Sequence, residues 1–109
     1  MSQEPPALSI VVPAYNEEEV LPQFHARLVA ALADIGLSWE VVYVNDGSKD
    51  GTLAVMLGLQ AQDHRVSVLN LSRNFGKEIA LTAGLDHARG AEAVAFFSQV
   101  SPARVLRCA

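Results

Sequence analysis

The sequence predicts an α/β fold in which alternating βαβ units form a mostly parallel sheet. Short apolar runs rich in β-branched residues alternate with segments of roughly ten residues that have helical spacing. The runs are nearly unbroken, as expected for strands that are buried on both faces of a sheet. Four runs are predicted to be strands: residues 8–12, 39–44, 66–71 and 93–97.

The first strand is expected to end at Pro13, because proline cannot donate a hydrogen bond to a sheet. A helix should follow, since Asn16 is a common capping residue and the acids Glu17 to Glu19 suit the positive end of a helix. Apolar residues then recur at helical spacing and predict the buried face of this helix. They are Phe24, Leu28, Leu32 and Ile35.

The second strand runs into a dense cluster of turn-forming residues at 45–51. A helix is expected over residues 52–62, with Asp50 as its cap. After the third strand, a polar loop at 72–77 leads into a helix over residues 78–88, which the fourth strand follows. The apolar face of the helix at 52–62 is expected to consist of Leu53, Met56, Leu57 and Ala61.

The composition is that of a globular domain and excludes several functional classes. Of 109 residues, 50% are hydrophobic and 18% are charged, which is not the balance of a disordered chain. A formal net charge of -4 with scattered charges offers no basic surface for nucleic acid. The single cysteine, Cys108, permits no internal disulfide, and no apolar run matches a membrane span or a signal peptide. We therefore expect a cytoplasmic chain with a tail (1–7), one domain (8–97) and a second tail (98–109).

Polar residues follow each of the first three strands, at the sheet edge where parallel α/β folds bind ligands. Tyr15 offers an aromatic face for a base, and Glu17 offers an acceptor for a ribose hydroxyl or a base N–H. Asp46 is placed to accept the N3–H of a uracil or an equivalent donor. Arg73 and Lys77 flank a glycine-containing loop before a helix, a setting that attracts phosphate. Each of the three loops alone also fits an ordinary turn. Their position together at the carboxyl edge of one sheet is what favours a nucleotide site.

Three motifs, at residues 10–18, 44–52 and 71–77, resemble the family-2 glycosyltransferases, and the resemblance extends over residues 8–97. It implies a partial GT-A (Rossmann-like) fold and a nucleoside-diphosphate sugar donor, usually with Mg²⁺ or Mn²⁺. The third motif is most similar to the branch that transfers sugars to polyprenyl phosphates, which includes dolichol-phosphate mannose synthases and bactoprenol glucosyltransferases. By motif position, the resemblance implies that Pro13, Tyr15, Glu17, Val44 and Asp46 line the nucleoside pocket and that Arg73 and Lys77 lie toward the diphosphate.

The sequence departs from this family after the fourth predicted strand. Such enzymes carry an Asp-x-Asp motif there, whose carboxylates hold the metal that bridges the donor phosphates. Ser98 and Val100 occupy those positions, and no residue from there to Ala109 resembles the family. We therefore expect neither metal ligands nor catalytic residues in this chain.

The departure leads to an expectation about activity. A truncated or frame-shifted chain would retain donor-nucleotide binding and be inactive alone, whereas its full-length relatives would act on polyprenyl phosphate at the cytoplasmic face of the membrane. The alternative is a divergent, non-catalytic nucleotide-binding or receiver-like interaction domain. In either case the open edge of the sheet is expected to allow self-association.

Two other α/β classes share the alternating pattern but lack the matching motifs. A dinucleotide-binding dehydrogenase needs Gly-x-Gly-x-x-Gly after the first strand, where this chain has Pro13-Ala14-Tyr15-Asn16. A receiver-like signalling domain needs an isolated phosphoacceptor aspartate after the third strand, which here ends at Leu71 and Ser72. Neither class explains the three polar loops together.

Overall fold

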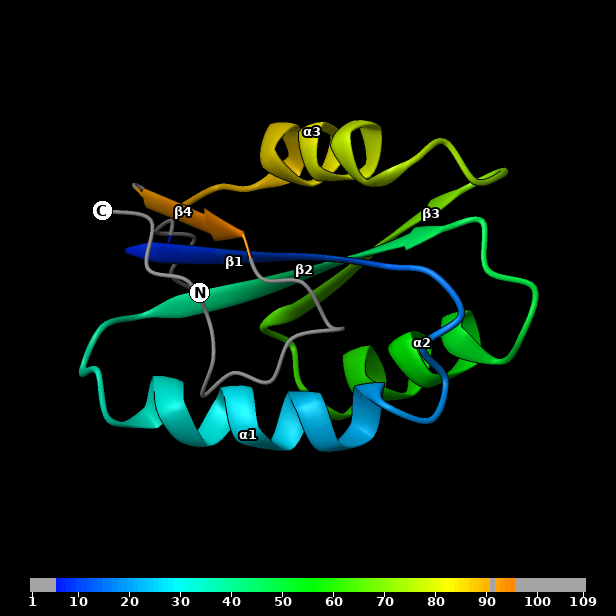
Figure 1. The fold of residues 1–109 in the computed structure, drawn as a ribbon. Coiled ribbons are helices and arrows are strands. Elements are labelled where there is room, and N and C mark those ends of the chain that lie inside the picture. Colours follow the sequence, from blue (N-terminus) through cyan, green and yellow to red (C-terminus); the bar gives the residue numbers. More distant parts are fainter. Residues whose placement is uncertain (1–5, 91, 96–109) are drawn as a thin grey trace.

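The computed structural model describes residues 6–90 and 92–95, which form a four-stranded sheet with helices on both faces (Figure 1). The elements in chain order are β1 (Leu8–Ala14), α1 (Leu21–Ala33), β2 (Trp39–Asp46), α2 (Thr52–Gln62), β3 (Val66–Leu71), α3 (Lys77–His87) and β4 (Glu92–Ala95). The strand order is β3-β2-β1-β4, and every neighbouring pair is parallel. This confirms the α/β arrangement that the alternating runs predict.

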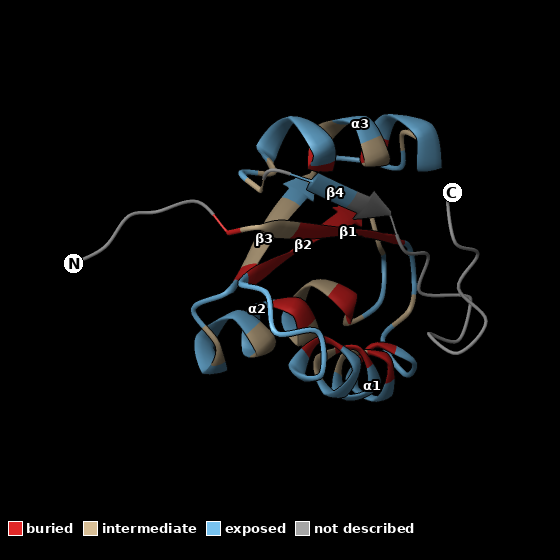
Figure 2. Ribbon diagram, turned by 90° about the vertical axis from the view of Figure 1, so that its left-hand side faces the viewer, coloured by how far each residue is buried: buried red, intermediate tan, exposed pale blue. Residues whose placement is uncertain are grey.

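The two central strands form the middle layer of the molecule. Figure 2 shows β1 and β2 almost entirely in the colour of buried residues, between α1 and α2 on one face and α3 on the other. Alternate side chains enter two cores: Ile10 and Val12 join the core under α1 and α2, whereas Val11 and Val44 join the core under α3. Burial on both faces explains why these strands read as continuous apolar runs.

The helix α1 buries the face that its spacing predicts. Phe24, Leu28 and Leu32 are all buried against the sheet. Ile35 lies beyond the end of the helix and is 48% exposed, so its inclusion in the predicted face was wrong. The apolar period stops where the backbone leaves the helix.

The helix α2 has the predicted bounds but only part of the predicted face, since Met56 is buried whereas Leu57 and Ala61 are exposed. Met56 is buried, and Val55 and Leu59 pack against the core, whereas Leu57 is 47% exposed. Apolar residues occur nearly all round this helix, so spacing alone could not select the face that meets the sheet. The buried face of α2 is set instead by its packing against the sheet, in which most of its contacts are with β3.

The helix α3 lies close to the sheet because it presents a glycine there. A Cβ on Gly84 would lie 2.3 Å from Cγ1 of Val11 and 3.0 Å from Cγ2 of Val44. Ala80, one turn earlier, is also fully buried. Two small residues thus allow α3 to lie close to β1 and β2.

The end of β1 and the start of α1 differ from the prediction. Pro13 does not end β1, which continues to Ala14. Among the described residues, β4 pairs with β1 only as far as Val11. The N–H that Pro13 lacks is therefore not needed for pairing with β4. Asn16 does not cap α1, which begins at Leu21 with a proline in its first turn. The φ of Asn16 is 54°, in the left-handed region, and its side chain bonds to the turn after β2 instead.

The outer strands of the described sheet are β3 and β4. The fourth strand covers Glu92–Ala95, and the last two residues of its predicted range lie outside the described residues. No helix within residues 6–90 and 92–95 is both long and apolar enough to cross a membrane.

Candidate functional site

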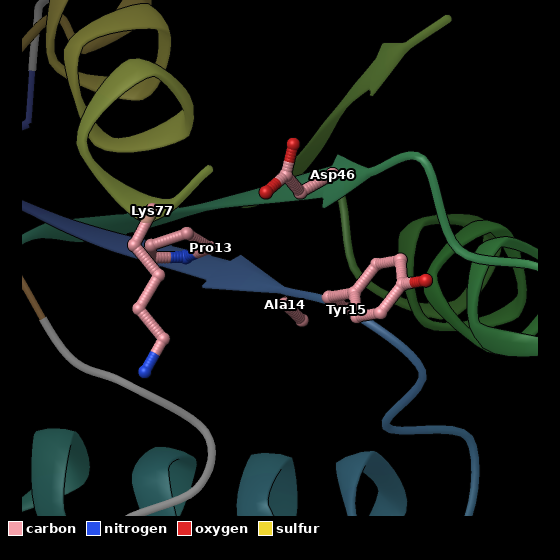
Figure 3. A pocket seen from close by; sticks show the side chains of 5 residues that line it. All are labelled: Pro13, Ala14, Tyr15, Asp46 and Lys77. Carbon is pink, nitrogen blue, oxygen red and sulfur yellow. The ribbon is translucent and has the colours of Figure 1, made fainter. Parts of the chain in front are cut away.

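A shallow, open pocket lies at the carboxyl ends of the two central strands (Figure 3). Its lining borders about 190 Å³ of space that includes open solvent, so it is a shallow depression and not an enclosed cavity. It is lined by Pro13, Ala14, Tyr15, Asp46 and Lys77, and four of these five were predicted from the sequence.

Tyr15 is the first residue after β1, and its side chain extends beyond the end of that strand (Figure 3). The residue is 36% exposed, so its aromatic face is available to a ligand in the pocket. Asn16, the next residue, turns the backbone away in a left-handed conformation, which asparagine adopts more readily than most residues. The turn leaves Tyr15 at the rim of the sheet.

Asp46 ends β2 and is 3% exposed. Its Oδ1 accepts the backbone N–H of Phe75 at 2.8 Å, and its Oδ2 accepts the backbone N–H of Gly76 at 3.1 Å. The side-chain amide of Asn74 also donates to the backbone oxygen of Asp46 at 3.2 Å and to Oδ2 at 3.4 Å. A carboxylate has about four acceptor positions, so these bonds leave room for one more donor from the pocket.

The turn after Asp46 is in close contact with the loop before α3. Gly47 has a φ of 73°, and a Cβ there would lie 2.2 Å from the carbonyl carbon of Arg73 and 2.3 Å from the backbone nitrogen of Asn74. Only glycine combines this backbone conformation with this proximity. The second and third polar loops are therefore one packed unit, an arrangement that the sequence motifs did not reveal.

Lys77 brings positive charge to the pocket. It is the first residue of α3, and its side chain lines the pocket from that helix (Figure 3). The first N–H groups of a helix and its positive end favour anions, so charge and backbone act in the same direction here. Arg73 lies four residues earlier with its guanidinium carbon 4.7 Å from the centre of the Phe75 ring. Arg73 is exposed and is not among the residues that line the pocket.

Two other predicted positions also lie apart from the pocket lining. Val44 is fully buried, with its side chain in the core under α3, so only its backbone could meet a ligand. Glu17 is half-buried, and its backbone N–H donates to Oγ1 of Thr52 at 2.8 Å. The N-cap of α2 is Gly51 and not the predicted Asp50, although Oδ1 of Asp50 accepts the N–H of Thr52, the first residue of α2, at 2.9 Å.

The pocket does not offer a set of metal ligands. Among residues 6–90 and 92–95, no three His, Cys, Asp or Glu side chains are grouped so that they could hold an ion. Asp46 is the single carboxylate in the pocket lining, its oxygens already accept N–H bonds, and the basic residue Lys77 also belongs to the lining. Mg²⁺ and Mn²⁺ prefer several oxygen ligands, so these residues do not fit the divalent ion that the family implies. Ser98 and Val100 lie outside the described residues.

Comparison with known proteins decides the family. The family model described as glycosyl transferase family 2 matches residues 9–98. The chain belongs to this family. Its fold is that of the GT-A glycosyltransferases, as shown by a mannosyltransferase from Pyrobaculum calidifontis solved with GDP-Man and Mn²⁺. That structure has a TM-score of 0.69 and 25% identity, over 88% of this chain and 28% of the mannosyltransferase.

Similar sequences include an uncharacterized glycosyltransferase and a protein whose name refers to bactoprenol. An uncharacterized glycosyltransferase from Synechocystis is 49% identical over 83 residues, which are 76% of this chain and 26% of the relative. A prophage bactoprenol glucosyl transferase homolog from Escherichia coli is 46% identical over 84 residues, which are 76% of this chain and 27% of the relative. The chain thus spans about a quarter of the length of these family-2 relatives.

Proposed function

We propose that this chain is the donor-nucleotide-binding part of a glycosyltransferase that uses a nucleoside-diphosphate sugar. The observation that carries the proposal is that Tyr15 after β1, Asp46 at the end of β2 and Lys77 at the start of α3 line one pocket. An aromatic face, a buried acceptor and a cation are the three groups that a base and its phosphates require. The pocket also lies at the carboxyl edge of a parallel sheet, where such ligands bind.

Each of the three residues has a distinct role in this proposal. The ring of Tyr15 stacks on the base, since stacking needs an exposed aromatic face and little else. The remaining acceptor position of Asp46 receives an N–H from the base. Lys77 and the first N–H groups of α3 attract the diphosphate. The predicted contributions of Glu17, Val44 and Arg73 remain proposals, with Val44 acting through its backbone and Arg73 from outside the pocket lining.

We further propose that the whole protein transfers its sugar to a polyprenyl phosphate at the cytoplasmic face of a membrane. Support comes from the bactoprenol glucosyl transferase homolog, which is 46% identical over the matched region. The ligands of the divalent ion used by the family would have to lie outside the described residues, because the described residues include no group of side chains that could hold it. That the 109-residue chain alone does not transfer sugar stays a prediction. It is tested by assaying release of nucleoside diphosphate from several nucleotide sugars with polyprenyl phosphate and Mn²⁺.

Titration of the 109-residue chain with UDP and with GDP tests the binding proposal. We expect weak saturable binding of at least one of them, and Tyr15→Ala should weaken it by about 10- to 100-fold, the usual contribution of one stacked base. Lys77→Ala should also weaken binding, whereas Lys49→Ala is the matched control, because Lys49 is exposed and its side chain does not line the pocket. Absence of binding for both nucleotides, or equal effects of the two lysine variants, would refute the proposal.

Self-association through the outer strands is also proposed. The outer strands β3 and β4 lie at the two edges of the described sheet, and an unpaired edge is a template for pairing with another chain. Sedimentation velocity over a concentration series should show a growing dimer or oligomer fraction. A single monomeric species at all concentrations would contradict this.

A further inference from the structure

The loop after β1 and the turn between β2 and α2 are joined by reciprocal hydrogen bonds, which we call the loop clasp. Three successive backbone N–H groups of the first loop donate to side chains of the second. Asn16 donates to Oγ of Ser48 at 2.9 Å, Glu17 to Oγ1 of Thr52 at 2.8 Å, and Glu18 to Oδ2 of Asp50 at 3.4 Å. Each of these three residues of the first loop is therefore held by its own hydrogen bond to the turn after β2 or to the start of α2.

The second loop in turn donates to side chains of the first. Oδ1 of Asn16 accepts the backbone N–H of Lys49 at 2.9 Å, and Oε1 of Glu18 accepts the backbone N–H of Gly51 at 3.1 Å. Asn16 therefore both donates to and accepts from the opposite loop. These are side chain–backbone bonds between segments more than thirty residues apart, so they fix one loop against the other rather than stabilising either alone.

The clasp is anchored to the sheet through the buried Asn45, which bonds to the exposed Asn70 of β3. Oδ1 of Asn45 accepts the backbone N–H of Ser48 at 3.2 Å, and its amide nitrogen donates to Oδ1 of Asn70 at 2.9 Å. Asn45 is 3% exposed and ends β2 together with Asp46, so it cannot move independently of the strand. Hydrogen bonds thus connect β3 through Asn45 and Ser48 to Asn16.

Asn16 is the residue through which the clasp reaches the pocket. It follows Tyr15 directly, and among the described residues it is the one non-glycine residue with a positive φ. Tyr15 is 36% exposed and does not belong to either core cluster. The backbone of Asn16, directly after Tyr15, is held by bonds on both its N–H and its side chain.

We propose that Asn16 and Ser48 are positioning residues that hold Tyr15 ready for a nucleotide base. The inference rests on the proposed function, in which Tyr15 stacks on the base. Neither residue lines the pocket, so both act through the backbone next to Tyr15. A loop ordered before the ligand arrives loses less freedom on binding, and this preorganisation increases affinity.

Variants of both residues test the proposal through nucleotide affinity and loop protection. Asn16→Ala removes the accepting oxygen and the tolerance for a left-handed backbone, Asn16→Gly removes only the oxygen, and Asn16→Asp keeps both. We expect Asn16→Ala and Ser48→Ala to weaken UDP or GDP binding about tenfold, the loss expected for about one well-formed hydrogen bond. Amide exchange at residues 15–18 of the nucleotide-free chain should accelerate in both. Asn16→Gly should be intermediate, and Asn16→Asp should bind within about twofold of the parent.

Ser38→Ala is the matched control. Oγ of Ser38 accepts the backbone N–H of Ala7 at 2.9 Å, the same kind of bond at the same length as at Ser48. It lies just before β2, at the opposite end of the sheet from the pocket. Its loss should leave nucleotide affinity and the exchange of residues 15–18 unchanged.

A double-mutant cycle separates positioning from general stability. If Asn16 acts through Tyr15, Asn16→Ala should change affinity less than about twofold once Tyr15 is alanine. Equal effects in both backgrounds would overturn the proposal, and so would unchanged affinity of Asn16→Ala and Ser48→Ala in a parent chain that binds nucleotide. Failure of the parent chain to bind either nucleotide would refute the proposed function, and this inference with it.

Discussion

Asp46 accepts the backbone N–H of Phe75 at 2.8 Å, a bond between residues 29 positions apart in the chain. The same carboxylate accepts the N–H of Gly76, the residue that caps α3, at 3.1 Å. It therefore stabilises the positive end of that helix as well as the loop before it. One buried side chain at the end of β2 fixes the segment that carries Lys77 into the pocket.

Asp46→Asn should destabilise the fold by about 1.5–3 kcal/mol, because an amide cannot accept both N–H bonds and brings an N–H₂ group against a donor. Urea unfolding at neutral pH measures the change. Asp86→Asn is the control: Asp86 is an exposed aspartate on α3, and its replacement should alter stability by less than about 0.5 kcal/mol. Equal stabilities of the two variants would show that the carboxylate does not hold the loop.

Gly47→Ala should be far more harmful than Gly36→Ala, although both glycines have a φ between 70° and 80°. At Gly36 nothing lies within 4 Å of the added Cβ, so the cost is that of the left-handed backbone, about 1–2 kcal/mol. At Gly47 the Cβ meets the backbone of Arg73 and Asn74, which cannot move without breaking the bonds to Asp46.

The two glycine variants are compared by thermal unfolding at the same pH. Gly47→Ala should lower the free energy of unfolding by at least about 1 kcal/mol more than Gly36→Ala does, which is the usual cost of overpacking. It should also accelerate amide exchange at residues 73–76, which Gly36→Ala should not. Similar losses in both variants would mean that the loop adapts without cost.

The fold could be predicted from the sequence wherever one physical signal dominated. The bounds of β3 at Val66–Leu71 and of α2 at Thr52–Gln62 follow from apolar period and flanking turn residues, and both are confirmed. Tyr15, Asp46 and Lys77 were expected near one another because polar side chains after parallel strands meet at one edge, whereas Pro13 was expected there from the family resemblance. These signals are local, or depend only on strand direction.

What could not be predicted depends on contacts between distant loops. Asn16 has the chemistry of a helix cap, and only the position of Ser48 and Lys49 in space shows that its amide is used elsewhere. The side chain of Val44 lies in the core because β2 is covered by α3 as well as by α1 and α2. The turn that binds Asn16 and the helix that covers Val44 both lie far from these residues in the sequence. Periodicity and capping preferences therefore carried no information about these contacts.

Gly84→Ala should destabilise the chain, whereas Gly58→Ala should stabilise it. Both glycines lie inside helices, where alanine is favoured by about 0.5–1 kcal/mol. At Gly58 the added Cβ meets nothing within 4 Å, so this preference is gained in full. At Gly84 the Cβ would lie 2.3 Å from Val11, and separating α3 from the sheet should cost about 1–3 kcal/mol.

Equilibrium unfolding of both alanine variants shows directly whether each substitution raises or lowers the free energy of unfolding. Opposite shifts of the denaturation midpoint from the parent are expected. Stabilisation by Gly84→Ala would mean that α3 can lift from Val11 and Val44 without loss, and that the close approach seen here is not required.

A buried carboxylate at the other end of the sheet joins β2 to the segment after α3. Glu40 is 2% exposed, and its Oε2 accepts the hydroxyl of Ser9 at 2.6 Å and the backbone N–H of Arg89 at 2.7 Å. Nε of Arg89 donates to Oε1 at 3.4 Å, and the N–H of Gly90 donates back to Oγ of Ser9 at 2.8 Å. This cluster holds the start of β1 and β2 against the chain that leads into β4.

The stability of the chain should therefore fall in acid through Glu40. Burial by itself raises the pKa of this carboxyl, but the bonds from Arg89 and Ser9 and the charge of Arg89 outweigh it and hold the pKa below the ordinary 4.5. The folded state then binds its proton at lower pH than the unfolded state. The contribution of Glu40 is fully present above about pH 4.5 and is lost as pH falls through the lower folded pKa.

Glu40→Gln tests this by removing the titration. At neutral pH the variant should be less stable by about 1–3 kcal/mol, because a glutamine amide places a donor beside the N–H of Arg89 or the hydroxyl of Ser9. The difference from the parent should shrink as pH is lowered below 4.5, since the parent then loses the same charged acceptor. Glu19→Gln, at an exposed glutamate, serves as the control and should show no such convergence. Urea midpoints measured in steps from pH 7 to pH 3 give the curves, and a constant difference between parent and Glu40→Gln would show that Glu40 does not titrate with folding.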